Sequence, residues 1–380
     1  MGKKNFNSFT IFPHFHRSPS DQFPILAPPM KIAAKLLFII TLFSLTKVHA
    51  QIGGSTSFVT LDLPLSARAA AIGGNCMAIN DNDINLATWN PAMLSSKMHT
   101  QLAFSFADYF SDIKYGYAGF AYHFDKIGTF ALTATHIDYG KFQEADNTGA
   151  IIGEFSAGEF GLNGSYSRMI DSSFTVGASA KFVQSHLYYW KSNAMALDLG
   201  ARYKIPHRDF TASFLFRNIG VMMSPYTSGI KEKLPFEVEA GLAFKPKHMP
   251  FRFSFAFTNL QKWDLTYIDP NNPPALVDPL TGDSIHVSKF KTFNDKFGRH
   301  LVVGGELLIG KAVSLRFGYN YMRRKELMVD GKHGAIGFTF GFGIHVYKFN
   351  LSYAHAAYHL AGGTNTITLT SSISDFYRKK

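Results

Sequence analysis

The sequence predicts an all-β fold, a transmembrane antiparallel β-barrel of about 14 strands with a small N-terminal helical plug. The chain of 380 residues contains 37 Phe, 17 Tyr and 32 Gly, the combination expected of aromatic girdles and close strand packing. From about residue 98 onward, segments of roughly ten residues alternate between apolar and polar side chains. No uninterrupted apolar run of about 20 residues follows residue 50, which excludes a helical membrane protein.

The first fifty residues are predicted to carry none of this fold. Residues 30–50 have the form of a signal peptide, with Lys31 and Lys35, an apolar core over 36–45 and a small-residue cleavage site at 48–50. The apolar core is too short for a spanning helix, which needs about 20 residues, although a plain N-terminal anchor is the alternative. Residues 1–29 are polar and precede Met30, so we expect them to be an extension from a misassigned start codon.

The exported chain would begin at Gln51 and contain a single cysteine, Cys76, which excludes an internal disulfide framework. No cysteine stands at the cleavage site, so a lipoprotein is not expected. The first fifty residues hold six Lys or Arg and one Asp, which reduces the formal charge from +11 to +6 for the remainder. This excess is not clustered, and nucleic acid is therefore not an expected partner.

Alternation is clearest in the segment FRFSFAFTN, residues 251–259, where every second residue is Phe. In a strand these rings share one face, and Arg252, Ser254, Ala256 and Thr258 share the other. Residues 313–321 and 336–346 repeat the pattern. In water such aromatic faces would need a second sheet to cover them, whereas in lipid they need no other cover.

Segments of this kind are predicted to start near residues 98, 114, 128, 158, 173, 193, 209, 236, 251, 299, 313, 335, 349 and 365. Every second connection is short, namely 125–127, 170–172, 206–208, 246–250 and 310–312. Longer connections alternate with them, notably 140–157, 220–235, 262–298 and 324–334. Short turns inside and long loops outside are typical of an outer-membrane barrel, and an even strand number places both mature termini in the periplasm. Twelve strands would result if the last two segments were wrong.

Residues 51–97 precede the first predicted strand and are long enough to fold back into the lumen as a plug. SARAAAIGG predicts a short helix with Ser66 as its N-cap and Gly73 and Gly74 as its end. In NPAML, Asn90 is expected to cap a second tight element with Pro91 at its first position. A lumen of this width would leak if it were empty, so a plug is expected.

Arg68, Asp81 and Asp83 complete the predicted plug motif. Buried beside Asp81, Arg68 would hold the plug in place, and a ligand contact is the alternative. Asp81, Asp83 and Asn85 also begin like a calcium loop, but Leu86 and Ala92 stand where that loop needs Gly and Glu. We therefore predict a turn with side-chain hydrogen bonds, no metal and no cofactor.

Charged residues on the inward rows could form a substrate path or, as we favour, a paired network that packs the interior around the plug. They are Asp198, Arg202, Glu237, Glu239, Arg252 and Arg316. The sequence contains no G-x-S-x-G, H-E-x-x-H or phosphate-binding glycine loop, so no enzymatic activity is expected.

The plug motif carries a resemblance to known families. Asn90-Pro91-Ala92 before a fourteen-strand barrel resembles the N-terminal hatch of FadL-type fatty acid transporters. SARAAAIGG followed by DNDINLATWNPA resembles more specifically the PorV/PorQ family of the type IX secretion system. Residues 73–75, 81–87, 98–117 and 124–146 are most similar to its PorQ branch. The likeness covers essentially the whole chain after residue 50.

The resemblance implies a non-enzymatic subunit of protein export, integral to the outer membrane of a Gram-negative bacterium. Its expected partners are other type IX components, namely the surface protein PorZ, the sortase-like PorU and PorV-like barrels, together with outer-membrane lipids. The alternative, implied by the FadL likeness, is a channel for fatty acids or other hydrophobic small molecules. That channel would need an apolar pocket, whereas a secretion anchor needs only a closed barrel and a binding surface outside.

The longest predicted loop, 262–298, is our candidate surface for the partner. It is rich in Asp, Asn and Pro, and a solvated loop without a partner is the alternative. The candidate residues are Trp263, Asp264, Asp269, Asp278 and Asp283.

Overall fold

The computed structural model describes residues 56–109, 112–227, 229, 231–266, 288–328, 334–359 and 362–377. The chain divides into a unit of Met1–Ala50, which lies outside these residues, and a unit of Gln51–Lys380. The fold below is that of the second unit.

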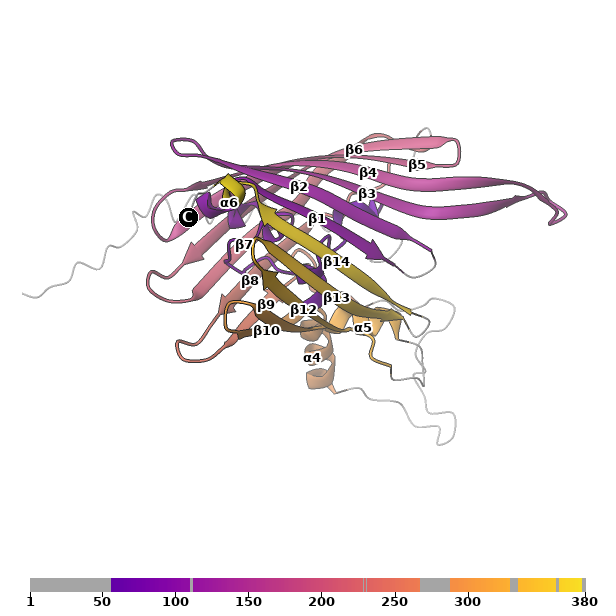
Figure 1. Ribbon diagram of the computed structural model, residues 1–380. Coiled ribbons are helices and arrows are strands. Elements are labelled where there is room, and N and C mark those ends of the chain that lie inside the picture. The colour runs from indigo at the N-terminus through magenta and orange to yellow at the C-terminus, as the bar shows by residue number, and fades with distance from the viewer. Residues whose placement is uncertain are drawn as a thin grey trace, which may run out of the picture. The chain divides into compact units, whose positions relative to one another are not determined.

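Fourteen strands form a closed barrel in which each strand is antiparallel to its sequence neighbours, and β14 pairs with β1 to close the sheet (Figure 1). The strands are β1 (Gln101–Asp108), β2 (Lys114–Phe124), β3 (Gly128–Ala145), β4 (Ile151–Met169), β5 (Phe174–Leu187), β6 (Trp190–Lys204), β7 (Phe210–Ser224), β8 (Glu237–Phe244), β9 (Phe251–Phe257), β10 (Leu301–Ile309), β11 (Val313–Asn320), β12 (Phe338–Val346), β13 (Phe349–His359) and β14 (Gly362–Ser372). The predicted fold class and the strand number are confirmed.

Short and long connections alternate along the chain as expected, but some connections at the end of the barrel with the long loops are also short. The connections after β2, β4, β6, β8, β10 and β12 are all short, and they share one end of the barrel with the start of β1 and the end of β14. We call this the short-turn end, and the opposite end the long-loop end. At the long-loop end, the connection between β5 and β6 is itself only residues 188–189.

The long loop predicted for residues 140–157 is wrong. β3 and β4 continue to pair there, from Lys141 with Ser156 to Ala145 with Ile151, and only residues 146–150 form the turn. In Figure 1 this hairpin extends beyond the other strands. In this hairpin β3 and β4 pair with each other beyond the point where their pairing with β2 and β5 ends. The backbone N–H and C=O groups of the hairpin are therefore hydrogen-bonded between its two strands.

The first and fourth strands also begin elsewhere than predicted. β1 begins at Gln101, because residues Ser96–Met98 form a short 3-10 helix, η3, before it. β4 begins at Ile151 rather than near 158 because of the extended hairpin. Apart from β4, every strand, β1 included, begins within three residues of its predicted position.

The strands alternate between an apolar outer face and a small or polar inner face. In β12, Phe338 and Phe340 are each 51% exposed, whereas Thr339 between them is 2% exposed. This is the pattern of a barrel whose outer face contacts lipid. Toward the long-loop end the outer face becomes polar along a row of cross-strand neighbours, which are His355, Asn365, Asp108, Lys114 and Asp138.

Helices occur in two of the predicted long loops. α4 (Lys289–Arg299) precedes β10, and α5 (Tyr321–Leu327) follows β11. A last short helix, α6 (Ser374–Tyr377), follows β14. Among the described residues, no helix has the length and apolar character to cross a membrane.

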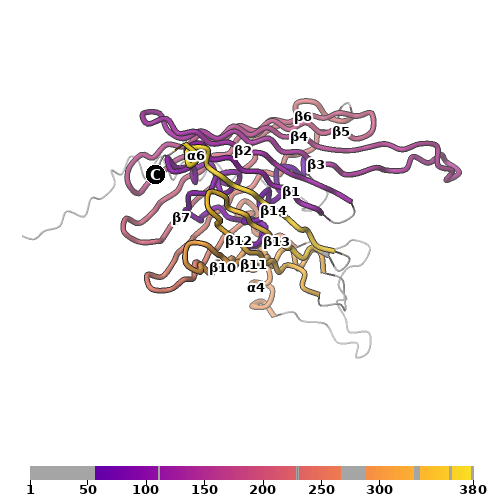
Figure 2. Tube along the Cα trace, in the orientation of Figure 1, coloured from indigo at the N-terminus to yellow at the C-terminus, as the bar shows by residue number. Residues whose placement is uncertain are grey.

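The N-terminal segment is built from short elements inside the barrel wall, as the tube in Figure 2 shows. They are η1 (Val59–Leu61), α2 (Ala67–Ala71), α3 (Ile84–Ala87), η2 (Pro91–Met93) and η3. We call residues 56–98 the plug. α2 contacts β11 to β14, and η2 contacts β4, β5 and β6, so the plug reaches opposite parts of the wall.

Candidate functional site

The lumen and its plug form the candidate functional site, and local capping shapes the plug. Ser66 Oγ accepts a hydrogen bond from the Ala69 backbone N–H at the start of α2. Gly73 and Gly74 follow this helix with φ of +95° and +96°, a backbone region that favours glycine. Asn90 Oδ1 accepts from the Ala92 N–H, and Pro91 occupies the first position of η2.

Arg68 lies at the centre of a buried ion-pair cluster. Its guanidinium lies 2.9 Å from Asp81, 3.1 Å from Asp83 and 3.0 Å from Glu306 of β10. Three acidic groups around one cation, from both plug and wall, tie α2 to the barrel. The sequence interpretation places Arg68 beside Asp81, and the two side chains are paired here, whereas the alternative of a ligand contact stays untested.

Glu306 joins the wall to this cluster, which we call the Arg68 cluster. Its carboxylate accepts hydrogen bonds from Arg68 Nε, from Arg252 Nη1 at 2.8 Å and from Arg316 Nε at 3.0 Å. Glu306 is 1% exposed, so its charge is sheltered from water and compensated by three guanidinium groups. Sequence reasoning missed Glu306, although a lone Glu on the inner row of LVVGGELLI was a usable signal.

Asp81 is an acidic residue of the plug within the Arg68 cluster. Burial acts to raise the pKa of the Asp81 carboxyl, but Arg68 and Arg252 outweigh it and hold the pKa at about 2. Asp81 is therefore ionised at neutral pH.

A second group of charges, the Arg217 cluster, surrounds Arg217 of β7. Arg217 Nη1 lies 3.1 Å from Glu237 and 3.0 Å from Glu239. From the plug, Trp89 Nε1 donates to Glu239 at 3.0 Å, and the Trp89 ring lies 3.8 Å from the Arg217 guanidinium carbon. Asn75 also donates to Glu239, at 2.8 Å, so this buried carboxylate holds two separate parts of the plug.

A third charged pair lies at an irregularity of the wall. Lys181 of β5 and Asp198 of β6 are 2.6 Å apart and both buried. The pairing of β6 and β7 shifts here, and Asn218 in the bulge adopts φ of +55°. Its backbone N–H donates to Asp198 at 2.8 Å, and Lys181 donates to its side chain at 2.9 Å.

The inward charges predicted as either a path or a network are all engaged. Glu237, Glu239, Asp198, Arg252 and Arg316 belong to the groups above, and Arg202 donates to Asn80 of the plug at 2.9 Å. Each of these side chains therefore has a polar partner, and the choice between a packed network and a substrate path stays a prediction.

Wall glycines make room for the plug backbone. A Cβ at Gly318 would lie 2.0 Å from the Gly73 nitrogen, and one at Gly177 would lie 2.5 Å from the Ala92 nitrogen. A Cβ at Gly200 would lie 2.3 Å from Asn90 Oδ1. These strands therefore need glycine because the plug touches the wall directly, a reason that the sequence alone did not reveal.

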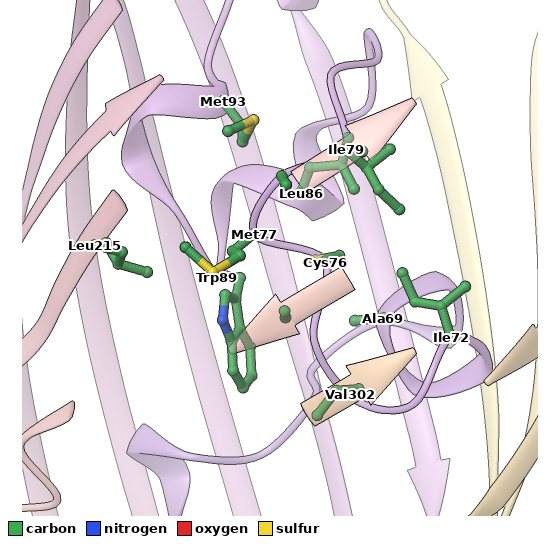
Figure 3. Packing of buried hydrophobic residues seen from close by; sticks show 13 residues of the cluster. Ala69, Ile72, Cys76, Met77, Ile79, Leu86, Trp89, Met93, Leu215 and Val302 are labelled. Carbon is green, nitrogen blue, oxygen red and sulfur yellow. The ribbon is translucent and has the colours of Figure 1, made fainter. Parts of the chain in front are cut away.

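An apolar cluster fills the space between the charged groups. Figure 3 shows Met77 beside Trp89, with Ile72, Ile79 and Leu86 from the plug and Leu215 and Val302 from the wall. Cys76 belongs to this cluster at 1% exposure, and burial raises the pKa of its thiol to about 12. The single cysteine is thus a packed core residue with little thiolate.

Three cavities stand out among the described residues. The largest, about 400 Å³, lies at the short-turn end between the plug and β9 to β14. It is polar, and its lining includes Arg68, Asp81, Asp83, Arg252 and Arg316. The other two, of about 30 Å³ each, have room for one or two water molecules. One of these has partly apolar walls, formed by Leu61, Leu63, Leu65 and Val183.

No metal site is formed by the described residues, since no group of three or more His, Cys, Asp or Glu side chains could hold an ion. In the stretch that begins like a calcium loop, Asp81 and Asp83 face Arg68 instead. Asp83 Oδ1 also caps α3 by accepting from the Asn85 N–H at 3.0 Å.

The predicted partner loop is described only at its two ends. Trp263 is 53% exposed and stacks on His300 with centroids 5.4 Å apart. Asp264 pairs with Lys296 of α4 at 2.6 Å. Asp269, Asp278 and Asp283 lie outside the described residues.

Comparison with known proteins returned matches among solved structures only. No family model matches the sequence, and no curated protein matches it. A deltaS2 mutant of the TodX monoaromatic hydrocarbon channel is 13% identical, with a TM-score of 0.48, over 82% of this chain and 98% of that one. The Pseudomonas putida toluene transporter TodX is 11% identical, with a TM-score of 0.47, over 85% of this chain and 98% of that one. A Pseudomonas aeruginosa FadL homologue is 11% identical, with a TM-score of 0.44, over 81% of this chain and 98% of that one. At these values the similarity concerns the barrel alone and carries no statement about substrate or partner.

Proposed function

We propose that this protein is a non-catalytic barrel of the Gram-negative outer membrane that acts as an anchor for surface proteins, as in the PorV/PorQ family of the type IX secretion system. The observation that carries the proposal is the plug, which is joined to the wall by the Arg68 and Arg217 clusters. Moving it would leave several buried charges without partners, at a cost of about 3–5 kcal/mol each. A plug held in this way supports a function at the outer surface of the molecule.

The nature of the partners rests on the sequence resemblance of residues 66–146. It implies PorZ-like and PorU-like surface proteins and a PorV-like barrel, with outer-membrane lipids around the wall. The segment 262–298 remains the proposed contact for these partners, and both mature termini would lie in the periplasm.

Affinity purification of the tagged protein from its native outer membrane, in mild detergent, tests this proposal. Proteins and lipids that copurify are identified by mass spectrometry. Stoichiometric recovery of PorZ-like or PorU-like proteins is the expected result. A lone barrel that carries bound fatty acids would reject the anchor function in favour of transport.

A loop deletion locates the contact. Removing 266–290 should leave the barrel assembled, as judged by heat-modifiable mobility in gels, and abolish recovery of the PorZ-like partner. The matched control replaces the turn 146–149, which also lies at the long-loop end, and should retain that partner. If both variants retain it, the partner binds elsewhere.

The second candidate function is passage of small hydrophobic molecules, the activity named for the TodX structures. Two of the structures compared above are described as a monoaromatic hydrocarbon channel and a toluene transporter. The observation in favour is the partly apolar cavity lined by Leu61, Leu63, Leu65 and Val183. Its volume of about 30 Å³ must grow to reach the roughly 300 Å³ of a small-molecule site. Uptake of radiolabelled toluene or oleate into vesicles that contain the protein distinguishes this candidate, because a closed anchor gives no uptake above empty vesicles.

A further inference from the structure

Helix α4, at the long-loop end, presents an aromatic side that is exposed in the part of the chain that the structure describes. Phe290, Phe293 and Phe297 recur at the spacing that places side chains on one side of a helix. They are 73%, 54% and 40% exposed. An apolar environment would stabilise three such rings on one helix, because it would remove their apolar surface from water.

The opposite side of α4 is bonded to α5. Asp295 accepts a hydrogen bond from the Tyr321 hydroxyl at 2.7 Å and lies 3.5 Å from Lys325 Nζ. Gly298 provides close approach, since a Cβ there would lie 3.1 Å from the Tyr321 ring. These contacts fix the rotation of α4 about its own axis. As a result, the aromatic side faces away from α5.

The aromatic side of α4 continues the lipid-facing surface of the barrel. Phe257 is the last outward residue of β9, and its ring centroid lies 6.1 Å from that of Phe297. Phe293 extends the row, 6.4 Å from Phe297 and 5.8 Å from Trp263. Figure 1 shows α4 beside β9 and β10, outside the barrel wall. An apolar surface in direct continuity with the wall meets the same solvent as the wall, which is lipid.

Basic residues border the aromatic side. Lys289 and Lys291 are exposed, and each is about 100° around the helix from Phe290, one on either side. Lysine beside an apolar face is the composition of helices that lie in a membrane interface, where the ammonium groups meet lipid phosphates.

We propose that α4 lies in the lipid interface at the long-loop end, with Phe290, Phe293 and Phe297 in the acyl region and Lys289 and Lys291 on phosphate groups of lipid. The partner is thus the bilayer itself, and the phosphate is that of a lipid headgroup. This inference needs the barrel to span a membrane. It assigns the aromatic side of α4 to lipid, so within the segment 262–298 the proposed protein contact then falls on other residues.

Fluorescence quenching tests the position of α4 in the full-length protein reconstituted into phosphatidylcholine vesicles. A bimane label is placed on Phe293→Cys or, as the matched control on the polar side, Thr292→Cys. Cys76 is buried and does not compete for the label. Nitroxide-labelled lipids should quench the label at 293, with a blue-shifted emission and loss of iodide quenching, whereas iodide should quench the label at 292. A second label at Phe290→Cys guards against misfolding of one variant, and heat-modifiable mobility checks assembly.

Vesicles of phosphatidylcholine mixed with lipid A test the lysines. Lipid A should increase the lipid quenching at position 293, and Lys289→Gln with Lys291→Gln should remove the increase. The control pair, Lys126→Gln with Lys247→Gln at the short-turn end, should retain it. Iodide quenching at 293 and 290 equal to that at 292 would overturn the proposal, because it would place the rings in water. If the label at 293 is quenched by lipid but this quenching changes neither with lipid A nor with the lysine variants, the proposed contacts of Lys289 and Lys291 with phosphate groups would be overturned.

Discussion

The inner and outer faces of the same barrel wall differ in chemistry at every strand. In β10 and β11, the inner face supplies Glu306 and Arg316 to the Arg68 cluster, whereas the outer face supplies apolar residues such as Phe317, which is 60% exposed. Inward groups have specific partners, often far away in the sequence. Outward groups need only be apolar, because lipid accepts any such side chain.

This difference teaches where sequence changes are tolerated. An inner residue is constrained by one particular neighbour, and removing that neighbour leaves a charge or a steric conflict behind. An outer residue is constrained by polarity alone. Four predictions test this contrast, from the largest expected effect to the smallest.

Glu306→Ala should cause the largest loss, about 3–5 kcal/mol of unfolding free energy, because three guanidinium groups would lose their shared buried carboxylate. Urea unfolding in vesicles, followed by gel mobility, measures the loss. Glu154→Ala is the control, since Glu154 forms an exposed pair with Lys141 at 3.1 Å. That pair should contribute at most about 1 kcal/mol. Equal losses would contradict the special role of the buried cluster.

Phe342→Arg should cost about 2–4 kcal/mol, because it places a cation on the lipid-facing side at the middle of β12. The same urea assay measures it. Tyr377→Arg in α6, at a residue 82% exposed and outside the strands, should change stability by less than about 0.5 kcal/mol. If Phe342→Arg were neutral, the outer face of β12 would not contact lipid.

Gly318→Ala should destabilise by about 1–3 kcal/mol and loosen the plug, because the new methyl group has no space beside Gly73. Protease accessibility of residues 66–98, added from the short-turn side, reports loosening alongside the unfolding midpoint. Gly305→Ala is the matched control in the neighbouring strand, where a Cβ would meet no atom within 4 Å. Similar behaviour of the two variants would show that the plug is not held against Gly318.

Acid should weaken the Arg68 cluster through Asp81, with the smallest of the four effects. The folded pKa of about 2 lies below the ordinary 3.8, so this stabilisation is complete above the ordinary value and is lost as the pH falls toward 2. Unfolding midpoints between about pH 5 and 2 should therefore fall more steeply for the natural protein than for Asp81→Asn. Parallel pH curves would show that Asp81 does not contribute.

Much of the architecture could be predicted because it depends on local patterns. The row of Phe residues in 251–257 indicated a strand, and Asn90 before Pro91 indicated a capped turn. The predicted loop over 140–157 failed because pairing between β3 and β4 extends past their other neighbours, and no local pattern marks where a hairpin leaves the barrel. α4 was missed because its aromatic spacing lay within a segment interpreted as one long loop.

By itself, the sequence determined the barrel class, the number of strands and the presence of a plug, since period-two alternation and turn residues act over a few neighbouring positions. Only the tertiary structure decided which charges meet. Arg68 and Glu306 are 238 positions apart, and their pairing follows from the closure of the barrel around the plug. The need for glycine at 177, 200 and 318 was likewise set by the plug backbone, because a steric limit exists only once both surfaces are in place.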